Sequence, residues 1–320
     1  MTAIESVGVH VPRYRIAADT VREAWGQFEP AGIQTVAVAG PDEDALTMAV
    51  EAAERALETS RHDRSAISTL AVGTTTPPLD ESDLAAQATE MLGLPRAVES
   101  ATFTQSTRAG TSALHSATAL REGPALVVAA DAPDGEPDEA LGQAAGAGAV
   151  AFVLADDGPT VLEETGTATR AYPGTRFRER GSETVSAYGA TTYERRAYTE
   201  TIARAIEDLP GEPDAIAPSA PDGSMPYRAT SDVDADPDVY QRASDLGDTG
   251  AASPLFGLLA AWDADEEDVV VVGYGDGASA DALRLTGSAP VESGSIDPVE
   301  VTYAEYLRIR GDLVSAGGDR

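Results

Sequence analysis

The chain of 320 residues carries 54 acidic and 22 basic side chains, a formal net charge of −32, and every basic side chain is an arginine. This charge disfavours nucleic acid and anionic membranes as partners, because binding to either needs basic patches that neutralise phosphates. The sequence contains no cysteine, which excludes disulfides, thiolate metal sites and cysteine catalysis.

The composition also indicates the setting in which the protein works. Abundant carboxylates without lysine are typical of a halophilic protein, since concentrated salt screens their repulsion; an acidic protein from ordinary salt is the alternative. The length exceeds what one ordinary core organises, and 42% hydrophobic residues suffice for a packed interior. Because the sequence shows neither an apolar run of about 18 residues nor a basic leader, we expect a soluble, cytoplasmic protein.

Buried strands and helices alternate through the first half of the chain. The run Ile4–Val11 is a strand stopped by Pro12, and Asp42 or Asp44 can cap the helix that follows. Small residues from Ser106 onward open another helical pattern. In chain order, the patterns predict strands over 4–11, 67–72, 124–131 and 145–157, and helices over 41–58, 83–95 and 106–123.

The second half begins with a polar stretch, 158–197, which we expect to be an irregular surface excursion. The acidic segment 226–240 is predicted to be a solvated face, because it lacks the central glycine and closing glutamate of a calcium loop. The other predicted elements are helices over 197–208 and 253–262, a short strand and turn over 213–223, and a strand, glycine turn and strand over 268–285.

Two stretches of the chain, 105–131 and 246–276, resemble each other. Each has a turn of small residues, an apolar helix, a short loop and a Val-rich strand. Each also follows a strand that ends in small polar residues, AVGTTT in one half and AIAPSA in the other. This internal repeat predicts an α/β protein with two related halves, 1–157 and 158–320.

A series of runs in the correct order resembles the archaeal branch of the hydroxymethylglutaryl-CoA synthase family of the thiolase fold. STRAGTSAL is similar to the family's ACKAGT nucleophile turn, GDTGAASPL to GNTYSGSSPL, and VGYGDGASADAL to SYGSGAGSDAF. The resemblance covers nearly the whole chain. It implies a thiolase-like, five-layered α-β-α-β-α fold that pairs as a homodimer, and acyltransferase chemistry on acyl-CoA in the mevalonate pathway. It also implies two archaeal partners, a thiolase and a small zinc-ribbon/OB-fold protein.

The positions that carry the family's chemistry are occupied by different residue types here. In the family a cysteine attacks acetyl-CoA, a glutamate moves protons and a histidine polarises acetoacetyl-CoA. The matching positions are Thr107 for the cysteine, Thr75 for the glutamate and Ser219 for the histidine, and Asp248 replaces an asparagine. A hydroxyl cannot shuttle protons near neutral pH, and a carboxylate beside a developing oxyanion is unfavourable. These replacements predict a catalytically impaired protein without a cofactor, a binder of acyl-CoA or a scaffold.

An active acyltransferase or thioesterase that uses other residues is the alternative. In its simplest form, Thr107 and Asp248 position a nucleophilic water. None of the three histidines matches the family's histidine, and His115 lies about two helical turns beyond Thr107. Asp80 and Glu81 are predicted to be surface acids.

Glycines and arginines are the remaining candidates for substrate binding. Gly110, Gly250, Gly275 and Gly277 stand where the family's backbone turns tightly around its pocket, and fold geometry alone is the alternative. Arginines can bind the phosphates of CoA, and ion pairing with neighbouring acids is the alternative. The arginines in question are Arg108, Arg176, Arg178 and Arg180. No stretch has the spacing of a metal site.

Overall fold

The computed structural model describes residues 1–188, 190–229, 233, 237–293 and 297–313, and its centre is a mixed sheet of 11 strands. The first half of the chain supplies three parallel strands, β5 (Glu99–Phe103), β4 (Thr69–Gly73) and β6 (Ala125–Asp131). Two antiparallel strands continue from β6, namely β7 (Gly148–Ala155) and β1 (Thr2–His10).

The second half of the chain repeats this order of strands. The parallel strands are β10 (Asp238–Val239), β9 (Ala215–Pro218) and β11 (Asp268–Gly275), and the antiparallel ones are β12 (Ser279–Thr286) and β8 (Thr160–Thr169). A short antiparallel pairing of β8 with β1 joins the two sets. The prediction of an α/β fold with two related halves is confirmed, while the boundary at residue 157 stays a prediction.

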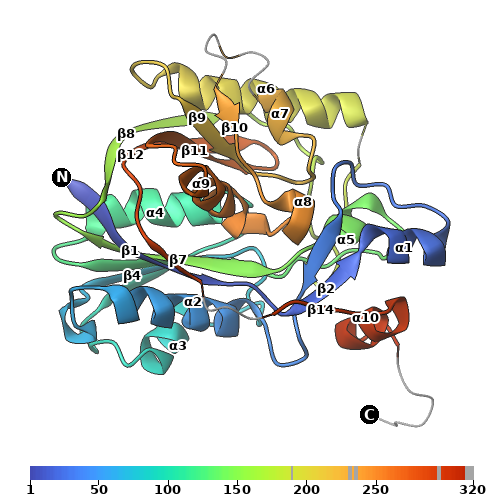
Figure 1. Ribbon diagram of the computed structural model, residues 1–320, viewed down its shortest axis with the longest axis horizontal. Coiled ribbons are helices and arrows are strands. Elements are labelled where there is room, and N and C mark those ends of the chain that lie inside the picture. Colours follow the sequence, from blue (N-terminus) through green and yellow to red (C-terminus); the bar gives the residue numbers. More distant parts are fainter. Residues whose placement is uncertain (189, 230–232, 234–236, 294–296, 314–320) are drawn as a thin grey trace.

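Helices lie in three layers around the two halves of the sheet (Figure 1). The helices α2 (Ala45–Thr59) and α3 (Leu84–Met91) pack on the outer face of the first half, and α6 (Thr191–Glu207) and α7 (Pro226–Ala229) cover the second. Between the halves lie α4 (Ala109–Leu120) and α9 (Ser253–Asp263), and α4 contacts β4 and β6 as well as β11 and β12. The result is the predicted five-layered α-β-α-β-α arrangement.

The middle layer explains why two apolar helices occur at equivalent places in the repeat. From Ser253 to Leu259 and at Ala261 and Trp262, α9 is buried, because sheet or helix covers it on most sides. Gly110 of α4 allows α4 to lie close to the chain just before α9, because a Cβ at this position would lie 2.2 Å from the carbonyl oxygen of Ala251. The starts of the two middle helices are therefore held close together.

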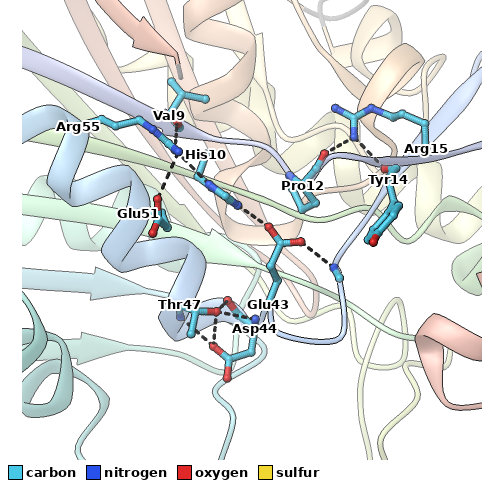
Figure 2. A network of polar contacts seen from close by, with 11 residues as sticks. Val9, His10, Pro12, Tyr14, Arg15, Glu43, Asp44, Thr47, Glu51 and Arg55 are labelled. Carbon is cyan, nitrogen blue, oxygen red and sulfur yellow. Dashed lines mark hydrogen bonds and ion pairs between the residues drawn. The ribbon is translucent and has the colours of Figure 1, made fainter. Parts of the chain in front are cut away.

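The start of α2 shows how local sequence signals operate. Asp44 is the N-cap, and its Oδ1 accepts a hydrogen bond from Thr47 N–H at 2.8 Å, while Thr47 Oγ1 accepts one from Asp44 N–H. In the residue before this cap, Glu43 Oε1 lies 2.7 Å from His10 Nε2, and Arg55 Nη1 lies 3.1 Å from Nδ1 of the same histidine ring (Figure 2). Because Arg55 can only donate, Nδ1 accepts and Nε2 carries the proton toward Glu43. His10 therefore links β1 to α2.

A smaller three-stranded sheet stands beside this core. It consists of β14 (Val299–Glu300), β2 (Tyr14–Ala17) and β3 (Thr35–Val38), with α1 (Ala18–Trp25) and α10 (Tyr303–Arg310) packed nearby. No helix in the described part of the chain is long and apolar enough to cross a bilayer. The remaining elements are η1 (Arg64–Ala66), α5 (Ala140–Ala144), α8 (Ala243–Leu246), η2 (Gly250–Ala252) and β13 (Val291–Ser293), which pairs with β1.

One expectation for the second half needs correction. The stretch 158–197 is not irregular throughout, because it contains the ten-residue strand β8 and the first turns of α6, which begins at Thr191. Threonine and valine favour a strand there, and acids on its solvent side disguise it as a loop. The segment 226–240 contains α7 and β10, and its residues 230–232 and 234–236 lie outside the described chain.

Candidate functional site

The candidate site forms where each half of the chain meets the middle helix of the other half. Asp131, the last residue of β6, accepts a hydrogen bond from Ala251 N–H just before α9. In the corresponding place, Thr107, just before α4, donates to the carbonyl oxygen of Tyr274 near the end of β11. A cavity of about 690 Å³ lies here, and Thr107, Ser219 and Asp248 line it. The fold therefore brings together three of the four positions that the family resemblance singled out.

Thr107 is the residue that the family resemblance matched to the nucleophile. Its side chain is buried, and Oγ1 lies 2.7 Å from the carbonyl oxygen of Tyr274 and 3.3 Å from Oδ2 of Asp276. A hydroxyl has a single proton to donate, and the shorter contact goes to the main chain. A base must remove that proton before the oxygen can attack, and Asp276 is the carboxylate within reach.

Asp276 is a site residue that the sequence reasoning did not single out. Burial raises the pKa of Asp276 to about 6, and the neighbouring Asp248 adds to the effect, while Arg176 and the Thr107 hydroxyl oppose it. A carboxyl group with a pKa near the working pH can take up and release protons. The available signal was an acid between two glycines after a Val-rich strand, where the family's run has a serine.

Arg176 and Asp248 form an ion pair inside the cavity. Their side chains are only 9% and 8% exposed, and Asp248 also accepts from Gly250 N–H at 2.9 Å. Against the effect of burial, Asp248 and Asp276 hold the pKa of Arg176 above its usual value. Because Asp248 is occupied by a cation, it is a weaker candidate base than Asp276.

Thr75, which the family resemblance matched to the glutamate, is part of a cage of hydrogen-bond donors around the carboxylate of Asp131. Its N–H and hydroxyl donate to Asp131 at 2.7 and 2.9 Å. Thr74 and Thr76 donate to the same carboxylate, which is completely buried. A Cβ on Gly250 would lie 2.2 Å from this carboxylate, so the cage stands directly behind the cavity wall.

Ser219, which the family resemblance matched to the histidine, is a neutral residue hydrogen-bonded to the protein itself. Its Oγ accepts a hydrogen bond from Tyr274 N–H at 2.9 Å, and its carbonyl accepts one from Tyr198 Oη at 2.6 Å. These bonds tie the end of β9 to β11 and α6. Ser219 therefore contributes a small neutral surface to the cavity.

The candidate arginines are separated by the fold. Arg108 pairs with Asp281 at 2.9 Å and lines a second cavity of about 540 Å³, together with His115. Arg178 donates to the carbonyl oxygen of Thr75 at 2.6 Å, and Arg180 is exposed.

The remaining candidates have mainly structural surroundings. A Cβ on Gly275 would lie 2.1 Å from Ser106 Oγ, and Gly277 has a φ of +106°, so both positions demand glycine. Asp80 and Glu81 are exposed. Among the described residues, no cluster of three or more acids and histidines is arranged to hold a metal ion.

Comparison with known proteins identifies the relatives of this chain. No family model matches it. The chain is 26% identical to the hydroxymethylglutaryl-CoA synthase of Thermoplasma acidophilum over 99% of both chains. It is 28% identical to that of Methanopyrus kandleri over 97% of both, and 29% identical to that of Pyrobaculum neutrophilum over 96% of both.

Solved structures agree on the fold. MvaS in complex with 3-hydroxy-3-methylglutaryl coenzyme A matches with a TM-score of 0.82 and 20% identity, over 97% of this chain and 91% of that one. The 3-oxoacyl-(acyl carrier protein) synthase III of Pseudomonas aeruginosa PAO1 matches with a TM-score of 0.77 and 16% identity, over 91% and 99%. The chain thus has the thiolase-like fold and is a full-length relative of the hydroxymethylglutaryl-CoA synthases.

Proposed function

We propose that the chain binds an acyl-CoA in this cavity and does not catalyse the condensation expected of the synthase family. One observation carries the proposal: at the nucleophile position, the hydroxyl of Thr107 is tied to a main-chain carbonyl at the edge of a retained cavity of about 690 Å³. Solved proteins of the same fold were obtained with 3-hydroxy-3-methylglutaryl coenzyme A and with CoA. Those ligands support acyl-CoA as the class of molecule to test.

The loss of condensation follows from three side chains. Thr107 offers a hydroxyl whose pKa is far above neutral, so it is a weak nucleophile without a base. The hydroxyl of Thr75 donates its hydrogen bond to Asp131, and the Ser219 side chain cannot become a cation. Proton transfer by a well-placed group contributes about 10²–10⁴-fold to a rate, so losing the acid/base group alone would slow condensation severely.

One observation favours the alternative of an active acyltransferase or thioesterase. The carboxyl group of Asp276 lies 3.3 Å from Thr107 Oγ1, and burial raises its pKa to about 6. In this version Asp276, and not Asp248, is the base that activates Thr107 or a water molecule. The released group would be free CoA.

A pair of measurements in molar salt separates the two. Calorimetry measures the binding of acetyl-CoA, acetoacetyl-CoA and longer acyl-CoAs, and a thiol reagent measures released CoA; the protein itself gives no signal because it has no cysteine. Binding without release supports the proposed binder. Saturable release that Asp276→Asn abolishes supports the alternative, and no binding by the folded protein refutes both.

The assembly and setting of the protein remain proposals that rest on the family resemblance. We propose a cytoplasmic homodimer that holds its ligand for an acyl-CoA or isoprenoid-precursor pathway, or serves as a scaffold for a thiolase and a zinc-ribbon/OB-fold protein. Light scattering in molar salt measures the oligomeric state. Mixing with those two purified proteins tests the scaffold role, which a stable complex would support and separate elution would contradict.

A further inference from the structure

The charges inside the cavity are unbalanced. Among the described residues that line it, Arg176 is the sole basic side chain. It is already paired with Asp248, and both side chains are nearly buried. The acids that line the cavity are Glu29, Asp138, Glu139, Glu194, Asp222, Asp248 and Asp276.

Asp276 and Glu194 are among the acids of this lining that form no ion pair within the described part of the chain. Burial raises the pKa of Asp276 to about 6, and Glu194, at the start of α6, contributes to that shift. Burial also raises the pKa of Glu194 itself. An added negative charge here would meet Asp276, Glu194 and Asp248 against one arginine, whereas an added positive charge would relieve their repulsion.

An aromatic wall with an unused polar atom stands beside these acids. Tyr274 is only 4% exposed, and its Oη has no hydrogen-bond partner within 3.5 Å in the described part of the chain. The hydroxyl of Thr175, on the same cavity wall, is near enough to lower its pKa, although burial and Asp276 raise that pKa overall. The ring of Tyr198 packs edge-on at 5.1 Å, and Tyr188 also lines the cavity. A ligand group that can donate a hydrogen bond would satisfy Tyr274, and aromatic faces with carboxylates favour ammonium groups.

We propose that the cavity selects acyl groups by charge: it prefers a thioester whose acyl chain carries an ammonium group and rejects one that carries a carboxylate. The inference rests on the proposed function, since it requires that acyl-CoA enters this cavity. It separates the chain from a binder of the 3-hydroxy-3-methylglutaryl group, which has a carboxylate. Two observations support the proposal: Asp276, Glu194 and the unpaired Tyr274 Oη belong to the lining of one cavity, and the arginine of that lining, Arg176, is already paired with Asp248.

The selection is expected to persist in concentrated salt. Exposed acids of the chain are screened there, since the Debye length is about 3 Å at 1 M. Asp248 is buried and Asp276 is half-buried, so their carboxyl groups are screened less than those on the surface. A charge preference measured in molar salt therefore reports the interior of the cavity and not the acidic surface.

Three thioesters of similar size test the proposal. Calorimetry in molar KCl at pH 8 compares β-alanyl-CoA, butyryl-CoA and malonyl-CoA, whose acyl chains end in an ammonium, a methyl and a carboxylate group. We expect β-alanyl-CoA to bind most tightly and malonyl-CoA most weakly, with on the order of tenfold between the extremes. Asp276→Asn should reduce that ratio, and the exposed acid Asp63, changed to Asn, is the matched control that should keep it.

A pH series adds a second readout. Burial raises the pKa of Asp276 to about 6; Asp248 and Glu194 add to this effect, and Arg176 and the Thr107 hydroxyl oppose it. The preference for β-alanyl-CoA should therefore weaken from pH 8 to pH 5, as Asp276 takes up a proton, while the ligand's amine stays charged. Equal binding of the three thioesters, or tighter binding of malonyl-CoA, overturns the charge selection and leaves the proposed function standing. No binding of any thioester overturns both.

Discussion

The carboxylate of Asp131 offers the sharpest test of how the two halves are held together. Oδ1 accepts from the N–H groups of Thr75 and Thr76 and from the hydroxyls of Thr74 and Thr76, and Oδ2 accepts from Thr75 Oγ1 and Ala251 N–H. Asp131→Ala would leave the N–H groups of Thr75 and Ala251 without an acceptor, while the Thr76 N–H would keep its second acceptor, Thr74 Oγ1. Each unpaired buried donor costs about 1–3 kcal/mol, so two of them give an expected loss of about 2–6 kcal/mol in the free energy of unfolding.

Asp131→Asn is a second test, because the asparagine side chain keeps the shape of aspartate and one of its two oxygen acceptors. The amide NH₂ group would face donors at the Oδ2 side, so we expect a smaller loss of about 1–3 kcal/mol. Urea unfolding followed by circular dichroism in molar KCl measures both variants. The exposed Asp63→Ala controls for the loss of one negative charge and should change stability by less than about 0.5 kcal/mol. If Asp131→Ala were no less stable than Asp63→Ala, the cage would not stabilise the fold.

Three further outcomes follow from the cavity. Because the folded-state pKa of Asp276 is raised from 3.8 to about 6, its ionised form costs stability above pH 6 and the cost fades as pH falls toward 4. Asp276→Asn should therefore be more stable than the parent by about 2–3 kcal/mol at pH 8 and nearly equal at pH 4 in urea unfolding; a constant difference would contradict this. Arg176→Gln leaves the buried Asp248 without its cation and should lower the free energy of unfolding by about 3–5 kcal/mol. The double variant Arg176→Gln/Asp248→Asn should recover most of this loss, whereas additive losses would refute the pairing. Thr107→Cys places a thiol just before α4, and we expect acetyl-CoA to acetylate this thiol, with one acetyl adduct seen by mass spectrometry. The variant should form no condensation product, and product formation would show that the site can still transfer protons.

The replacements at the site share one physical consequence. Thr107, Thr75 and Ser219 are neutral and make hydrogen bonds to the protein itself. The titratable chemistry left in the cavity belongs to Asp276 and its neighbours. A site whose carboxyl groups at Asp276 and Glu194 have raised pKa values can bind and sense charge without the set of groups that a condensation requires.

The sequence by itself determined the class of fold and the place of the site. The alternation of Val-rich strands with apolar helices, and the repeat of 105–131 in 246–276, predicted two related α/β halves, because burial on both faces leaves a visible apolar pattern. Short motifs also placed Thr107, Ser219 and Asp248 at one site. Strand β8 was not predicted, because the acids on its solvent side interrupt the apolar pattern of a strand.

Only the tertiary structure decided what the site residues can do. Thr107 meets Asp276 across 169 residues of sequence, and Arg176 meets Asp248 across 72. The pKa of a carboxyl group depends on its burial and on every charge around it, and these belong to segments that only folding brings together. For that reason the sequence singled out Asp248, while in the folded chain Asp248 is paired with Arg176, and the cavity contains Asp276, whose pKa is raised by burial to about 6.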